Sequence, residues 1–322
     1  MSQTETLIET PEARSPQRAD RRAFFATAFG AAAVGAGALA LTAQPAAAQT
    51  IASEVDVLNF VLNIEYLQAN FFAVATGGAA LATADISGSG TAGAASGARA
   101  VSFADAVFGS IAKEMAADAL AHVRFLRSSL TTAYAVAQPA IDLGSTPTSA
   151  FSGLARAAGL VGAGQAFDPY ASEENFLLAA FMIKDVSVTA YGGIMGLITT
   201  RAYQEAVGGM LAVEAHHAAA IRGLLYRRGL GTPSLIDASE AISNARDTLD
   251  GAAADLDQGV RPSTSGSGAA IANVAPLNAN GLAISRTPQQ VLNVLYLNGG
   301  TATSGGFFTA GVNGTIKSTA TS

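Results

Sequence analysis

Glutamate and histidine side chains interrupt the apolar face of a helical segment near residue 214. Glu214 and His217 lie in line with the apolar residues Val207, Met210, Leu211, Ile221 and Leu224. Residues three or four positions apart project from one face of a helix, so both side chains point the same way. A Glu-x-x-His pair on the inward face of a helical bundle is the spacing of a di-metal carboxylate site. The segment is therefore predicted to supply metal ligands.

Two other periodic segments carry similar side chains on their apolar faces. Glu65 lies in the middle of one stripe, and Asp118 and His122 lie four positions apart in another. A buried carboxylate is costly unless it is paired with a cation or bound to a metal ion. The set therefore indicates a metal site built from Glu65, Asp118, His122, Glu214 and His217. The alternative is a buried network of hydrogen bonds and salt bridges without metal.

Four long helices are expected to position these residues. Apolar periodicity predicts them at about residues 53–76, 102–137, 172–200 and 203–228. Segment 140–172 is rich in Gly and Pro and is interpreted as a long crossover between two helical hairpins. This order predicts an all-α fold, a ferritin-like four-helix bundle with a long central crossover.

The residues after the fourth helix have a different character. A further helix is predicted at about 236–256, followed by many isolated Gly, Asn and Thr residues. The expected organisation is a bundle over residues 49–230 and an irregular C-terminal extension, 231–322, packed on it. The extension is a candidate surface for binding an envelope or surface partner. The sequence is also compatible with a homo-oligomer.

The first 48 residues have the order of a secretory signal. Arg21 and Arg22 precede an apolar run, and small residues end at Ala48. Paired arginines before such a run are typical of a twin-arginine signal. We therefore expect bacterial export to the periplasm or the exterior, with cleavage after Ala48. The alternative is a membrane anchor.

Composition excludes several functional classes. The chain has 18 basic and 24 acidic residues, a net charge of −6, and no basic cluster, which argues against nucleic-acid binding. It has no Cys, so disulfides, thiolate catalysis and iron–sulfur ligation are excluded. A GSGTAG sequence at 88–93 matches a dinucleotide motif, but no strand is predicted before it. No organic cofactor is expected.

The chain resembles the ferritin-like proteins of the Ferritin_2 family, which are related to plant desiccation-related proteins. The resemblance lies in LNIEYLQANFF at 62–72, EMAADALAHVRFLR at 114–127, KDVSVTAYGG at 184–193, VEAHHAAAIRGLL at 213–225, SRTPQQVLNVLYL at 285–297 and GGFFTAGVNG at 305–314. It implies that the metal positions of the family fall on Glu65, His122, Glu214 and His217. Only these four of the six ligands of a complete di-iron site remain.

The two departures from the family pattern are Ala119 and Lys184, where the family has glutamates. Lys184 aligns with apolar residues of the third helix, so its ammonium is one candidate to replace the charge of a lost metal ion. In the alternative, the helix is rotated, Lys184 reaches solvent, and Asp185 points inward as a substitute ligand.

These residues predict an exported ferritin-like protein with a degraded di-metal site. It is expected to bind one iron or manganese ion or none, and to act in stress protection or as a structural component of the envelope. The alternative is a di-iron oxidase or peroxidase that acts on oxygen or peroxide. The missing acids at Ala119 and Lys184 argue against it.

Overall fold

The computed structural model describes residues 53–251 and 255–320. Four long helices dominate it: α2 (Glu54–Gly77), α4 (Ala106–Tyr134), α6 (Glu173–Ile194) and α7 (Arg201–Gly229). They confirm the predicted all-α bundle. The expected signal and its cleavage site lie outside the described residues.

Local capping explains where the helices begin. Ser53 and Asp56 form a reciprocal capping box at the start of α2. Helix α4 begins at Ala106 rather than near Ser102, because the carboxylate of Asp105 accepts the backbone N–H groups of Val107 and Phe108. The predicted cap of the second helix was therefore wrong by a few residues.

The bundle consists of two helical hairpins. Helix α2 packs mainly on α4, and α6 packs mainly on α7, while contacts between α2 and α6 join the hairpins. Stacked aromatic rings of Phe71 and Phe176, 4.8 Å apart, lie at the α2–α6 contact. Helices α2 and α6 are buried on nearly all sides, so they form the centre of the fold.

Two helical segments are long and apolar enough to cross a bilayer, judged by length and composition alone. They are Glu54–Gly77 and Glu173–Leu197, and 89% and 83% of their most apolar windows are buried inside the fold. Core helices of folded proteins meet the same criterion, so this is weak evidence for a membrane span.

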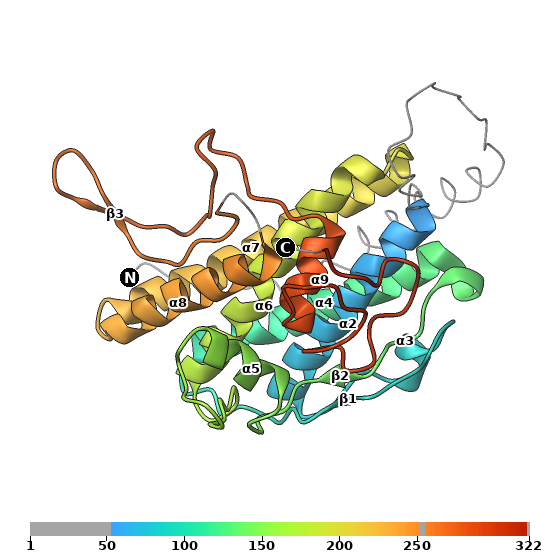
Figure 1. Ribbon diagram of the computed structural model, residues 1–322, viewed down its shortest axis with the longest axis horizontal. Helices are drawn as coiled ribbons and strands as arrows, with labels where there is room; N and C mark the ends of the chain where they lie inside the picture. Colours follow the sequence, from blue (N-terminus) through green and yellow to red (C-terminus); the bar gives the residue numbers. More distant parts are fainter. Residues whose placement is uncertain (1–52, 252–254, 321–322) are drawn as a thin grey trace, which may run out of the picture.

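The connections carry short elements that periodicity did not reveal. Before α4 lie α3 (Thr83–Ile86) and β1 (Ala95–Ser96), and the crossover contains β2 (Ile141–Asp142) and α5 (Ala150–Ala157). Strands β1 and β2 pair in parallel, which ties the loop before α4 to the crossover. The crossover runs lengthwise along one side of the bundle, from the end of α4 to the start of α6 (Figure 1). A short 3₁₀ turn, Met195–Leu197, links α6 to α7.

The C-terminal extension is more ordered than expected. It contains α8 (Pro233–Asp250), the two-stranded hairpin β3 (Ser263–Thr264) and β4 (Ala270–Ile271), and α9 (Pro288–Tyr296). The hairpin projects beyond the helices, while α9 lies against the bundle (Figure 1). Helix α9 begins with a capping box between Thr287 and Gln290, a local signal that was missed.

Candidate metal centre

Three of the predicted ligands meet at the centre of the bundle. Glu65 from α2, His122 from α4 and Glu214 from α7 each offer a ligand atom, and these atoms lie within 4.8 Å of one another. His122 Nδ1 lies 3.4 Å from Glu65 Oε1 and 3.9 Å from Glu214 Oε1. Two ligands of one ion, each bound at about 2.1 Å, lie up to about 4.2 Å apart. The buried Glu/His/Glu group could therefore hold a metal ion.

Each of the three residues has one buried atom without a hydrogen-bond partner. Among the described residues these atoms are Glu65 Oε2, His122 Nδ1 and Glu214 Oε1. Leaving a buried polar atom unpaired costs about 1–3 kcal/mol, and more for charged groups. A cation bound within the Glu/His/Glu group would supply a partner for atoms of this kind. The residues present thus fit one metal ion.

The remaining carboxylate oxygens are held by neighbouring side chains of α6. The hydroxyl of Tyr191 donates to Glu65 Oε1 at 2.7 Å. The hydroxyl of Ser187 donates to Glu214 Oε2 at 2.6 Å. Hydrogen bonds of this kind orient ligands and tune the metal they hold. Both carboxylates are therefore fixed with one oxygen free.

Lys184 lies in the core beside Glu214. Its side chain is 1% exposed, and its Nζ donates to Glu214 Oε2 at 2.7 Å. It also donates to Gln68 Oε1 at 2.6 Å and lies 3.3 Å from His217 Nδ1. This placement decides between the two interpretations of Lys184, because the ammonium does not reach solvent.

Burial and neighbouring charges shift the pKa values of the side chains in and around the metal centre. Burial alone would raise the pKa of Glu214, but the Lys184 ammonium and the two imidazoles hold it far below its usual range. Burial would lower the pKa of His122, yet the nearby Glu65 carboxylate raises it. Burial, and next the Glu65 charge, raise the pKa of Tyr191 well above 10. At neutral pH Glu214 is therefore ionised and Tyr191 is a neutral hydrogen-bond donor.

His217 and Asp118 flank the group. His217 Nδ1 lies 3.7 Å from Glu214 Oε1, and its Nε2 lies 3.3 Å from Asp118 Oδ2. The Asp118 side chain is 28% exposed, whereas Glu65 and Glu214 are fully buried. Asp118 thus lies at the rim of the centre and contacts it through His217.

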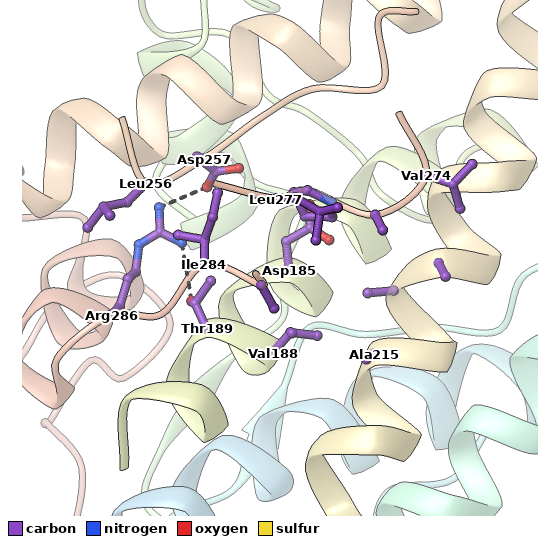
Figure 2. Close-up of a pocket in the computed structure, with 15 residues that line it drawn as sticks. Asp185, Val188, Thr189, Ala215, Leu256, Asp257, Val274, Leu277, Ile284 and Arg286 are labelled. Atoms are coloured by element: carbon purple, nitrogen blue, oxygen red, sulfur yellow. Dashed lines mark hydrogen bonds and ion pairs between the residues drawn. The ribbon is translucent and has the colours of Figure 1, made fainter. Parts of the chain in front are cut away.

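The structure does not bring Asp185 to the metal centre. Its Oδ2 accepts from Arg222 Nη1 at 2.8 Å and lies 3.3 Å from Arg246 Nη2. It lines an apolar pocket of about 90 Å³ between α6, α7 and the C-terminal extension. Figure 2 shows Asp185 there with Leu277 and Ile284 of the extension. The next residue on a helix points about 100° away, so Asp185 and Lys184 serve different faces of α6.

Residues that the sequence did not single out complete the centre. Gln68 lies three positions after Glu65, and Ser187 lies three positions after Lys184. Each therefore shares a helix face with a residue that had already been identified. This three-residue spacing is the sequence signal from which both residues could have been predicted to lie at the centre. Glu114, which is in register with Asp118, is exposed.

Comparisons with known proteins identify the family of the chain. The family model described as ferritin-like domain matches residues 53–227. The desiccation-related protein PCC13-62 of Craterostigma plantagineum is 30% identical over 74% of this chain and 76% of its own length. The ferritin-like catalase Nec2 of Nesocodon mauritianus is 25% identical over 82% of this chain and 85% of its own length. No solved structure matches the chain significantly. With its four-helix core and its matched segment of more than half of the chain, this protein belongs to the ferritin-like domain family.

Proposed function

We propose that this protein is an exported ferritin-like protein that binds one iron or manganese ion through Glu65, His122 and Glu214 and acts in stress protection. The buried Glu/His/Glu group, in which each residue also has one unpartnered buried atom, supports this proposal most directly. Two carboxylates and one imidazole suit both metals. The kinship with a protein named desiccation-related supports the stress role.

The side chains of α6 prepare the ligands. Tyr191 fixes one oxygen of Glu65, and Ser187 and Lys184 fix one oxygen of Glu214, so both carboxylates are held in place. A redox-active ion there would supply reactivity toward oxygen species. Burial of both carboxylates keeps bulk water from the ligands. The chain thus provides a rigid, preformed site.

A second candidate is an enzyme that acts on peroxide. The relative named a ferritin-like catalase favours it. In the described residues, however, the ligand group comprises three residues rather than six. We therefore rank metal-dependent protection above two-metal oxidation. A structural role in the envelope is compatible with the projecting β3–β4 hairpin.

Elemental analysis of the exported protein, purified without added metal, tests the first proposal. We expect about one iron or manganese ion per chain, and its loss in His122→Ala. The matched control is His216→Ala, because His216 is exposed on α7 and lies outside the ligand group. No metal in the wild type, or equal metal in both variants, would refute the proposed site.

Peroxide decomposition by the metal-loaded protein separates the two candidates. Turnover that disappears in His122→Ala and persists in His216→Ala would establish the enzyme. Absence of turnover in a protein that holds its ion would favour the non-enzymatic role.

A further inference from the structure

We propose that the ammonium group of Lys184 fills a second cation position next to the metal centre and so limits the centre to one metal ion. This inference rests on the proposed function. Its evidence is the set of atoms around Nζ: Gln68 Oε1 at 2.6 Å, Glu214 Oε2 at 2.7 Å and His217 Nδ1 at 3.3 Å. Two oxygens and an imidazole nitrogen are also the donors that bind divalent ions in proteins.

The surroundings of Lys184 form a site built for a positive charge. The ring of Phe72 lies 5.7 Å from Nζ, within the range of cation–π attraction. Glu214, fully buried, provides the compensating negative charge. The ammonium excludes a second ion both by its volume and by its like charge.

Glu214 has two oxygens with different tasks. Oε2 accepts from Lys184 and Ser187, whereas Oε1 has no hydrogen-bond partner and lies 3.9 Å from His122 Nδ1 and 3.7 Å from His217 Nδ1. Glu214 therefore connects the ammonium on one side with the metal position on the other. Glu214 thus lies between two cation positions, as a bridging carboxylate does in a two-metal centre. Here the Lys184 ammonium takes the place of one of the two metal ions.

The length of the side chain predicts what a substitution would do. In Lys184→Glu, a carboxylate oxygen would take the place of Cε, one bond or about 1.5 Å short of Nζ. Metal–oxygen bonds are about 2.0–2.2 Å long. An ion near the former ammonium position would therefore reach the new carboxylate together with Gln68, Glu214 and His217.

The experiment counts bound ions. The full chain is stripped with a chelator, loaded with Mn²⁺, freed of excess metal and assayed for manganese per chain. We expect Lys184→Glu to bind one more ion than the wild type. Lys113→Glu makes the same charge change at an exposed position of α4 and should match the wild type. An equal count in Lys184→Glu and the wild type would overturn the inference.

A second variant covers the case in which Lys184→Glu does not fold. Lys184→Met removes the charge and adds no strong ligand, so a bound Mn²⁺ would take over the compensation that the ammonium gave to Glu214. The rise in melting temperature on adding Mn²⁺ should then exceed that of the wild type, and an equal or smaller rise would contradict the inference. A wild type that binds no ion would refute the proposed function separately, because the inference is judged by the difference between variant and wild type.

Discussion

Removing the Lys184 ammonium should strongly destabilise the metal-free protein. In Lys184→Met the stem stays nearly the same size, but the carboxylate of Glu214 remains in the core. It is fully buried and would keep one hydroxyl donor, Ser187, while its nearest imidazole nitrogens lie 3.7 and 3.9 Å away. Removing one partner of a buried ion pair lowers the free energy of unfolding by about 3–5 kcal/mol.

Thermal unfolding of chelator-treated protein at neutral pH measures this loss. For a chain of this size, 1 kcal/mol corresponds to about 2–4 °C, so the melting temperature should fall by about 6–20 °C. Lys113→Met, at an exposed position of α4, is the matched control and should stay within about 0.5 kcal/mol of the wild type.

A double variant separates lost charge from lost packing. Lys184→Met combined with Glu214→Gln removes both charges at nearly constant volume, and neutral replacement of a buried pair is often tolerated. It should therefore recover much of the stability that Lys184→Met loses. A double variant no more stable than Lys184→Met, or a single variant as stable as the wild type, would show that the ion pair does not control stability here.

Three other predictions follow from single contacts or motifs. Tyr191→Phe removes the hydroxyl that orients a ligand carboxylate, so Mn²⁺ affinity measured by calorimetry should fall about 10–100-fold; unchanged affinity would contradict this role. The hydrogen bonds from Arg124 lower the pKa of Asp85 below 3.8. The stability that these hydrogen bonds give the folded protein is present above that pH, and it is lost as the pH falls through the folded-state pKa of Asp85. Asp85→Asn should thus cost up to about 1 kcal/mol at neutral pH and nothing in strong acid, as urea unfolding across pH would show. Replacing both Arg21 and Arg22 by Lys should leave uncleaved precursor in the cytoplasm, detectable by fractionation and immunoblotting; normal export would exclude a twin-arginine route.

The helices and much of the ligand set could be predicted from the sequence. Periodicity is a local property, and apolar stripes placed the four long helices within four residues of their observed bounds, except that the third helix ends at Ile194 rather than near residue 200. Glu65, His122 and Glu214 were identified because a polar side chain in the middle of an apolar face must point inward with it. Several polar residues within one turn can serve as the N-cap of a helix. The choice of Asp105 therefore shifted the start of α4 by a few residues but did not change which segment is helical.

Tertiary structure alone decided the roles of Lys184 and Asp185. Helix α6 is buried on nearly all sides, so its apolar pattern does not distinguish the face toward α2 from the face toward α8. The choice depends on partners far away in the sequence: Gln68 and Glu214 receive the ammonium, and Arg222 and Arg246 receive the carboxylate. Periodicity shows that a side chain is buried, but only the packing of other helices determines which charge it meets.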